Sequence, residues 1–456
     1  MDDDAPDNAS YRRVPAGRAA RIGTFGRLAG GLAGGVMAEG ARRIARGERP
    51  TMREVMLTPG NATRLADKLS ELRGAAMKLG QMVSMDAGDF LPPELAAIMA
   101  KLRDQAYRMP PRQLRDVLNA EWGEGWRRRF AMFNATPIAA ASIGQVHHAR
   151  LPDGRELAIK VQYPGVAQSI DADVDNVATL LRVAKVLPPE LAIEPLLDEA
   201  KRQLREEADY LREGAQMERY RGLLDDDPRF VVPALHEPLT TPRVLAMDYI
   251  ASKPVEWLDT APQDVRDAAM RDLIALVVRE LFDLGVMQTD PNFANYRWLP
   301  GENRMVLLDF GATRDVSEPV VEAYRGLLAA GLAQDRDAVR EAAMASGFVA
   351  PIVAERHRAS MDRMIDIIVT ELNRPGPFDF GDRAFVGTLR DEGMTMAQDK
   401  ATWHLPPIDT LFVQRKVSGT ALLAARLKAR VNVRDIVRPY VTGSPGRAPT
   451  GAATNR

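Results

Sequence analysis

The sequence predicts an α+β protein in which a small sheet lies between two long helical stretches. Over residues 61–85, apolar side chains recur at alternating spacings of four and three, which forms one apolar stripe on a helix. From about residue 138 the period changes to two. Residues 145–150 and 156–162 flank Pro152-Asp153-Gly154, a pattern typical of a β-hairpin. After about Glu318 the pattern is mainly helical again.

The composition limits the class of protein. The chain has 456 residues, 62 acidic and 61 basic side chains, and a formal net charge of −1. This length suggests about two or three domain-sized units. The balanced charge argues against a nucleic-acid partner, since dedicated nucleic-acid binders are usually strongly basic. The chain contains no cysteine, so disulfides, thiolate catalysis and cysteine-ligated zinc or iron–sulfur centres are excluded.

The same periodicities predict the remaining elements. Helices are expected over 171–220, with a break at Pro188-Pro189, and over 268–284 as a buried helix. Short strands are expected over 230–233, 244–249 and 306–308, and a linker over 373–380.

Four polar residues stand in a pattern that indicates chemistry. The strand 157–161 places Lys160 on the face opposite its apolar neighbours, and a lysine in so apolar a strand needs an anionic partner. Asp290 and Asn295 lie five residues apart, just after the predicted buried helix. Asp309 begins an Asp-Phe-Gly triplet that follows a strand, 19 residues after Asp290.

Protein kinases combine such residues in this order: a strand lysine, a loop Asp, an Asn five residues later, and the Asp of an Asp-Phe-Gly triplet. Each fragment occurs by chance, but the conjunction predicts a kinase-like site for ATP or ADP with Mg²⁺. The oxygens of Asp309 and Asn295 are suitable ligands for Mg²⁺. Asp290 is expected to orient or deprotonate an acceptor hydroxyl or water.

The segment expected to cover the phosphates is rich in alanine rather than glycine. Alanine excludes most positive-φ conformations, so this loop should be stiffer than a glycine-rich one. The expected nucleotide-contacting residues, besides Lys160, Asn295 and Asp309, are Ala139, Ala140, Ala141, Ser142, Ile143, Gly144, Gln145 and Val146, together with Met247 and Tyr249 of the strand 244–249.

Two further motifs lie on predicted helices: Lys78-Leu79-Gly80-Gln81 and Glu207-Ala208-Asp209-Tyr210. With the segments 139–146, 158–165, 287–295 and 308–314, they make the sequence resemble the AarF/UbiB atypical protein-kinase-like family, which is tied to ubiquinone (coenzyme Q) biosynthesis. The resemblance covers about residues 15–440.

The resemblance implies a two-lobed kinase-like fold with a helical N-terminal extension over the active site. Lys78 would then reach Glu207 and Asp209 and compete with Lys160 for Glu207, so Lys78 and Glu207 join Asp290 and Lys160 as candidate catalytic residues. The expected parts are a disordered tail (1–15), the helical extension (16–135), an N-lobe (136–250), a C-lobe with a helical extension (251–442) and a second disordered tail (443–456).

The resemblance also implies an ATPase that supports ubiquinone biosynthesis at the membrane, with protein kinase activity doubtful. The expected partners are a prenyl lipid or ubiquinone precursor, ubiquinone biosynthetic enzymes and an anionic membrane surface. The alternatives are a small-molecule or lipid phosphotransferase and a non-catalytic, nucleotide-gated scaffold. The expected location is cytoplasmic, with peripheral contact at the inner membrane.

Two stretches are candidates for that membrane contact. Residues 22–37 carry glycines at spacing four, which also suits a closely packed helix. Residues 411–456 hold nine Lys or Arg and one acid, with a basic helix predicted over 421–430. A solvated helix face is the alternative for this second stretch.

Overall fold

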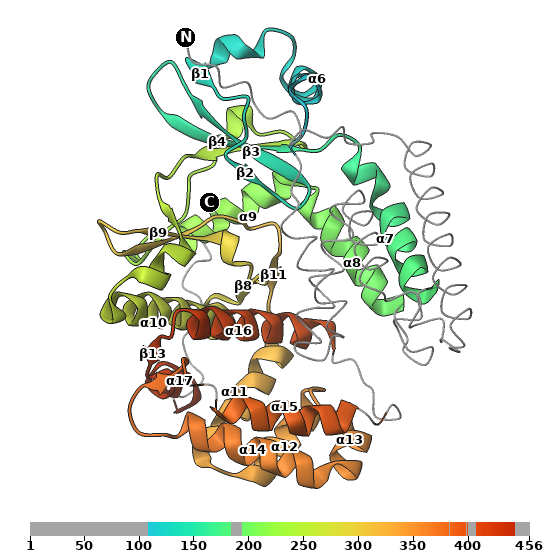
Figure 1. Cartoon of the computed structure of the whole chain (residues 1–456), viewed down its shortest axis with the longest axis vertical. Coiled ribbons are helices and arrows are strands. Elements are labelled where there is room, and N and C mark those ends of the chain that lie inside the picture. Colours follow the sequence, from blue (N-terminus) through green and yellow to red (C-terminus); the bar gives the residue numbers. More distant parts are fainter. Residues whose placement is uncertain (1–107, 184–193, 383, 398, 400–406, 443–456) are drawn as a thin grey trace, which may run out of the picture. The chain divides into compact units, whose positions relative to one another are not determined.

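The computed structural model describes residues 108–183, 194–382, 384–397, 399 and 407–442. These residues form two compact units (Figure 1). The first contains the described residues up to Lys253 together with Asn295–Thr313, and the second contains Pro254–Ala294 and the described residues from Arg314 onward. Lys78, the predicted helix 61–85 and the segment 22–37 lie outside the described residues.

The first unit is built on two sheets of mostly antiparallel strands. Its helices are α6 (Pro111–Trp122), α7 (Val166–Val183), α8 (Glu194–Glu207) and α9 (Tyr210–Leu223). Its strands are β1 (Met132–Phe133), β2 (Ala139–Ala140), β3 (Gly144–Arg150), β4 (Glu156–Gln162), β5 (Phe230–Val231), β6 (Val244–Asp248), β7 (Lys253–Pro254), β9 (Tyr296–Leu299) and β10 (Arg304–Leu307). One sheet has the order β1-β3-β4-β6 with β2 paired to β3, and the other has the order β5-β10-β9-β7, in which β5 and β10 pair parallel.

The predicted hairpin is present and positions Lys160. β3 and β4 pair antiparallel, and Lys160 lies opposite Val146 on one side and Leu245 of β6 on the other. Gly154 in the connecting turn has a φ of 93°, which favours glycine. Because directly opposite residues share a face of a sheet, Lys160 projects from the same face as Val146 and Leu245.

An aromatic cluster packs α6 against the edge of this sheet. The Trp126 ring lies 5.7 Å from Trp122 and 4.8 Å from Phe133, measured between ring centroids. The buried ring of His147 stacks on Phe133, bonds the Asn134 carbonyl oxygen through Nδ1 at 2.8 Å, and lies with Nε2 2.9 Å from the Gln145 amide. Burial lowers the pKa of His147 to about 4, so the ring is neutral at physiological pH.

The helical stretch predicted over 171–220 has a break that was not predicted, and the break expected at Pro188-Pro189 lies outside the described residues. α8 ends at Glu207 and α9 begins at Tyr210. Asp209 caps α9, its carboxylate accepting a bond from the Arg212 backbone N–H at 3.1 Å, and Asp is a favoured residue at this position. The amide of Gln162 donates to the Ala208 carbonyl at 2.9 Å and holds the break in place. The placement of Glu207 and Asp209 on one helix was therefore wrong.

The second unit is mainly helical. Its α-helices are α10 (Gln263–Arg279), α11 (Glu318–Ala333), α12 (Arg336–Ala345), α13 (Pro351–Arg356), α14 (Arg358–Leu372), α15 (Ala384–Ala397), α16 (Ile408–Arg426) and α17 (Val433–Thr442). Its short strands are β8 (Val286–Gln288), which pairs with β11 (Thr313–Asp315), and β12 (Phe378–Asp379), which pairs with β13 (Arg430–Val431). The buried helix predicted over 268–284 and the helix start near Glu318 are confirmed.

The core of this unit joins α10, β8, α11 and α16. It contains Val277, Leu281, Met287, Val320, Val321, Tyr324 and Val413. α10 continues into a π-helical turn, Glu280–Leu284, which ends at Gly285 in the left-handed region with a φ of 61°. π-turns are rare and often occur at functional positions.

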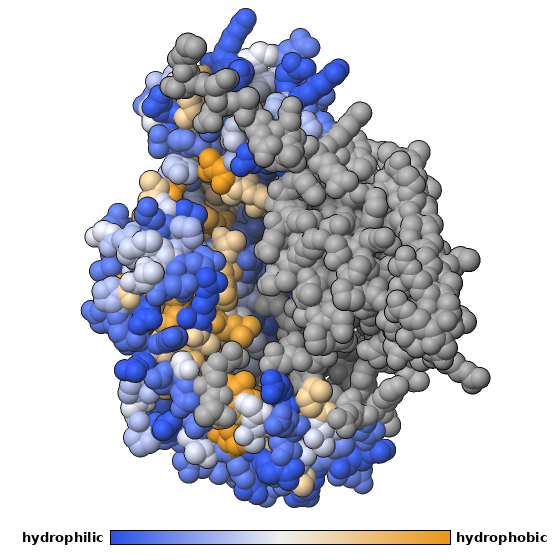
Figure 2. Space-filling view, in the orientation of Figure 1, coloured by the Kyte–Doolittle hydropathy of each residue, from blue (hydrophilic) through white to orange (hydrophobic). Residues whose placement is uncertain are grey.

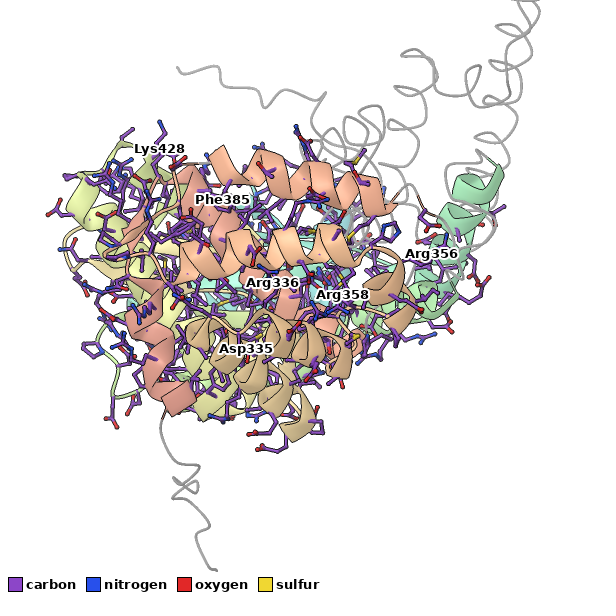
Figure 3. All side chains as sticks on the ribbon, turned by 90° about the horizontal axis from the view of Figure 1, so that it is seen from below. Asp335, Arg336, Arg356, Arg358, Phe385 and Lys428 are labelled. Carbon is purple, nitrogen blue, oxygen red and sulfur yellow. The ribbon has the colours of Figure 1, made fainter. Side chains whose placement is uncertain are left out.

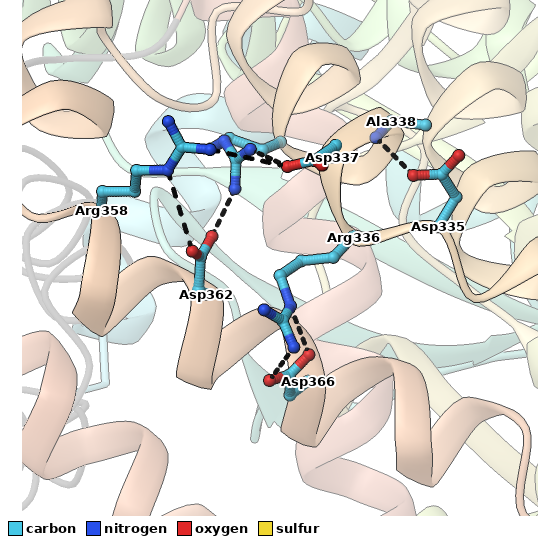
Figure 4. Close-up of polar contacts among 8 residues, drawn as sticks. Asp335, Arg336, Asp337, Ala338, Arg358, Asp362 and Asp366 are labelled. Carbon is cyan, nitrogen blue, oxygen red and sulfur yellow. Dashed lines mark hydrogen bonds and ion pairs between the residues drawn. The ribbon is translucent and has the colours of Figure 1, made fainter.

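Ion pairs connect α12 and α14 in the helical part of the second unit (Figures 3 and 4). Arg336 forms a two-pronged pair with Asp366, with both nitrogen–oxygen distances at 2.6 Å. The buried Arg340 bonds Asp337 and Asp362, and Arg358 approaches Asp362 at 3.9 Å. Each guanidinium faces a carboxylate from its own unit, so these ion pairs hold α12 and α14 together.

The basic stretch near the C-terminus differs from its prediction. α16 runs through 421 and ends at Arg426, and Arg430 belongs to β13, so the separate helix over 421–430 was wrong. Arg426 pairs with Asp259 and Arg430 with Asp379, each at 3.0 Å. These acids lie far away in sequence but neutralise part of the cationic stretch, which therefore presents less free charge than its composition indicates.

The described surface is mixed in character. Polar side chains cover most of it in the view of Figure 2, and apolar side chains show between them in small groups. Within the described part of the chain, no helix combines the length and the apolar character needed to span a bilayer.

Candidate functional site

The centre of the candidate site is a buried ion pair in the first unit. The Lys160 ammonium on β4 donates to both carboxylate oxygens of Glu213 on α9, at 2.7 and 2.9 Å. It also lies 3.4 Å from Oδ2 of Asp309 and 5.1 Å from the centre of the Tyr210 ring. Lys160 is 7% exposed and Glu213 1%. The arrangement fixes one positive charge between two carboxylates.

Burial and the neighbouring charges shift the pKa values of Lys160 and Glu213 in opposite directions. Burial lowers the pKa of Lys160, but the Asp309 and Glu213 carboxylates outweigh it and hold the pKa well above its ordinary value. Burial raises the pKa of Glu213 to about 7, and Lys160 opposes that rise. Lys160 is therefore a permanent cation, suited to an anionic ligand such as a phosphate.

The structure corrects the expected partner of Lys160. Glu207 was expected to be the carboxylate for which Lys160 and Lys78 compete, but Glu213 holds Lys160. Glu207 instead accepts a bond from the Ser142 hydroxyl at 2.9 Å, so it ties the alanine-rich segment to the end of α8. Glu213 lies on the buried stripe of α9 with Tyr210 and Met217, which aims it at β4.

The Asp-Phe-Gly turn is held by the same helix, α9. Arg212 donates to the carbonyl oxygens of Gly311 and Thr313, both at 2.7 Å. Phe310 is buried against Tyr220, with 5.0 Å between ring centres. Oδ1 of Asp309 accepts the Gly311 N–H at 3.0 Å, which leaves Oδ2 toward Lys160. Sequence analysis did not single out Arg212, whose signal is only its place beside the acidic motif.

Glu207 also lies beside this turn. A methyl group on Gly311 would lie 3.3 Å from Oδ1 of Asp309 and 3.6 Å from Cγ of Glu207. The structure therefore brings together Ser142, Glu207 and Asp309 from three separate segments.

The alanine-rich segment is exposed at its start and buried toward its end. Ala139 and Ala140 are exposed, and Ser142 is half-buried. Ile143 and Gln145 are buried, and the Gln145 amide accepts the Met109 N–H at 2.9 Å. The Ile143 and Gln145 side chains thus face protein, and a nucleotide contact by these two residues stays a prediction.

Gly144 serves close packing at the start of β3. A Cβ at this position would lie 2.5 Å from the Val161 carbonyl oxygen and 2.8 Å from the Tyr210 hydroxyl. Backbone at 2.5 Å cannot yield without moving β4. The glycine in this segment is therefore required by the contact between β3, β4 and α9.

We expect Gly144→Ala to lower the free energy of unfolding by about 1–3 kcal/mol, the usual cost of overpacking. Gly222→Ala is the matched control, since a Cβ on this residue of α9 meets no atom of the described residues within 4 Å. Denaturant unfolding of both variants measures the difference. Equal stability for Gly144→Ala and wild type would show that the strands separate at no cost.

Met247 and Tyr249 occupy different surroundings. Met247 lies directly opposite Ala158 in the sheet, so it shares the face that carries Lys160. The Tyr249 ring lies 4.3 Å from the ring of His148, and its backbone N–H donates to the Glu156 carbonyl at 2.9 Å. The position of Met247 fits a ligand beside Lys160, whereas Tyr249 follows β6 and lies beside Glu156 at the start of β4.

Asn295 lies near Asp309, and Asp290 belongs to the other unit. The Asn295 carbonyl accepts the Leu308 N–H at 3.0 Å, next to Asp309 in sequence. Asp290 is half-buried in the loop that follows β8. Lys78 lies outside the described residues.

The described residues contain no group of three or more acidic or histidine side chains suited to a metal. Mg²⁺ at phosphate sites commonly takes only one or two carboxylates, and phosphates and water complete its shell. The Asp309 carboxylate, one-third exposed, and the Asn295 amide fit that donor set.

Comparison with known proteins now supplies the family. The family model described as "ABC1 atypical kinase-like domain" matches residues 101–343, more than half of the chain. The chain belongs to the ABC1 atypical kinase-like family. The resemblance to the AarF/UbiB family is thus confirmed, and so is the kinase-like α+β fold.

Relatives extend the match of this ABC1-family protein over most of its length. "Atypical kinase COQ8B, mitochondrial" from Danio rerio is 35% identical over 434 residues, covering 94% of this chain and 69% of the relative. "Atypical kinase COQ8, mitochondrial" from Saccharomyces cerevisiae is 33% identical over 437 residues, covering 94% and 86%. The solved complex of Rv3197 with erythromycin, from Mycobacterium tuberculosis, matches with a TM-score of 0.58 and 26% identity, covering 84% of this chain and 96% of that one.

Proposed function

We propose that this ABC1-family protein binds ATP with Mg²⁺ and hydrolyses it, and that this activity supports ubiquinone biosynthesis at a membrane. The observation that supports the proposal most is the buried pair of Lys160 and Glu213 beside Asp309. A kinase-like site needs a fixed cation for the phosphates and a carboxylate for the metal, and these are the parts that α9 holds in place.

The residues have distinct roles in this proposal. Lys160 neutralises phosphate charge, and Glu213 fixes its ammonium. Asp309 and Asn295 hold Mg²⁺, which would offset the charge that develops on the transferred phosphoryl group. Asp290 accepts the proton of the attacking water. Glu207 and Ser142 keep the alanine-rich segment close to the Asp-Phe-Gly turn, and Lys78 is proposed to modulate the site through Glu207.

The experiment is phosphate release from ATP with Mg²⁺, with and without a prenylated phenol, in the presence of anionic liposomes. Release that does not need an acceptor supports an ATPase. Phosphate appearing on the phenol or a lipid supports the phosphotransferase alternative. Tight nucleotide binding without turnover under all conditions supports the scaffold and overturns the proposal.

We further propose peripheral, electrostatic contact with anionic lipid through residues 22–37 and their flanking arginines, which lie outside the described residues. The partial neutralisation of the C-terminal stretch makes the N-terminal segment the stronger candidate. We expect the protein to float with anionic liposomes at low salt and to dissociate at high salt, because screening weakens surface attraction. Protein that stays soluble at low salt would contradict this contact.

A further inference from the structure

A lysine of the second unit is buried, although it belongs to the stretch 411–456 that was considered as a membrane-facing or solvated surface. Lys416 on α16 is 1% exposed. Its ammonium donates to Oε1 of Gln288 at 3.1 Å and lies 3.7 Å from Oε2 of Glu280. The desolvation of an ammonium is costly unless opposite charge and hydrogen bonds compensate it. These two contacts across more than a hundred residues of sequence are therefore a built feature of this unit.

Glu280 and Gln288 are joined to each other as well. Oε1 of Glu280 accepts the backbone N–H of Gln288 at 3.3 Å. Glu280 opens the π-helical turn at the end of α10. One carboxylate thus faces both the backbone of Gln288 and the cation that binds its side chain.

Gln288 is the last residue of β8 and stands two residues before Asp290. Its side chain is buried, and its amide Nε2 has no hydrogen-bond partner among the described residues. The hydrogen bond from Lys416 to Oε1 therefore orients this amide. Removing the ammonium would leave the buried amide without its bond at Oε1 as well as at Nε2. The end of β8 would then be less firmly held.

We propose that Lys416 and Glu280 are positioning residues that fix Gln288, and through it the loop that carries Asp290. The inference deepens the proposed function, on which it rests, because it assigns to α16 a part in placing the proposed base. Neither residue needs to touch the nucleotide. Chemistry is sensitive to such placement, since a displacement of about 1 Å can reduce a rate by about 100-fold.

The test compares three full-length variants with wild type. Lys416→Met keeps an unbranched side chain, one atom shorter, and removes its charge. Because a lone buried Glu280 carboxylate could unfold the protein, Glu280→Gln/Lys416→Met removes both charges and retains an acceptor for the Gln288 N–H. Lys428→Met is the control, since Lys428 is exposed just beyond the end of α16.

We expect the double variant to fold and to bind ADP with unchanged affinity, while its turnover number falls by about 10- to 100-fold. Lys428→Met should match wild type in ADP affinity and in turnover number. A folded double variant with wild-type turnover would overturn the inference, and so would a parallel loss of nucleotide affinity and turnover.

A second readout separates this inference from the proposed function. If wild type itself shows no turnover, the proposed function fails, and amide hydrogen exchange then decides the positioning role. We expect faster exchange over residues 286–292 in the double variant and unchanged exchange over β4. Unchanged exchange over 286–292 would overturn the inference whatever the activity.

Discussion

Asp309→Asn should lose Mg²⁺-dependent ATP turnover by about 100-fold or more, because the substitution removes the charge proposed to hold the metal and offset the developing phosphate charge. The fold should survive. The Asn amide oxygen can still accept the Gly311 N–H that Oδ1 of Asp309 accepts at 3.0 Å. Lys160 keeps both of its bonds to Glu213. Phosphate release at saturating ATP and Mg²⁺ measures the effect.

Asp153→Asn is the control for this variant, since Asp153 is an exposed acid in the hairpin turn and, within the described part of the chain, bonds only its neighbour Arg155. It should retain full turnover. Melting temperatures of both variants exclude unfolding as a cause. Full turnover in folded Asp309→Asn would remove Asp309 from the proposed site and leave the buried pair without a catalytic role.

Much of the fold followed from local patterns, and the correct parts share a cause. The hairpin of β3 and β4 has a clear period of two and a turn with glycine at positive φ, and the buried helix α10 has continuous apolar character. Such signals lie in neighbouring residues, so they can be read without tertiary contacts. Lys160 and Asp309 were found for the same reason, because each lies in a short motif.

The partner of Lys160 was missed because the prediction followed the acidic motif at Glu207 and not the pattern of buried residues on α9. Glu207 belongs to a recognisable acidic motif, and Glu213 does not. Yet Glu213 falls on the apolar face of α9 with Tyr210, Met217 and Tyr220, and an acid on such a face requires a buried cation. Because the helix breaks at Asp209, the residues of α9 face directions that a continuous helix over 171–220 does not predict. Reading Asp209 as a helix N-cap would have predicted this break.

In the C-terminal basic stretch, composition does not determine which cations are free and which are buried or paired. Lys416, Arg426 and Arg430 count equally in a charge sum, but one is buried and two form ion pairs within their unit. Their partners Glu280, Asp259 and Asp379 lie at unrelated places in the sequence. Pairing over such separations depends on tertiary packing, which residue spacing does not encode.

Lys160→Met should strongly destabilise the protein and should also reduce nucleotide turnover. Removing one member of a buried ion pair typically costs about 3–5 kcal/mol, because the remaining group must stay buried as an uncompensated charge or take up a proton. Here that group is Glu213, which loses both of its bonds from the Lys160 ammonium. Chemical denaturation at neutral pH measures the loss.

The loss should depend on pH in a defined direction. Lys160 lowers the pKa of Glu213, so in Lys160→Met that pKa lies above the value of about 7 found with the lysine present. In the unfolded chain the same carboxyl ionises at about 4.3. Between these pH values the unfolded chain releases its proton and the folded variant retains it. The stability of the variant therefore falls as pH rises, by up to about 1.4 kcal/mol per pH unit.

Lys160→Met/Glu213→Leu separates stability from function. With both charges replaced by apolar side chains, the stability should return close to that of wild type, and its dependence on pH above 4.3 should flatten, as found for buried ion pairs replaced as a unit at about neutral cost. Turnover should stay low, because nothing then binds the phosphates in place of the ammonium. A double variant that recovers stability and turnover together would show that Lys160 serves packing alone. A single variant whose stability does not change between pH 5 and pH 8 would contradict the burial of an uncompensated Glu213.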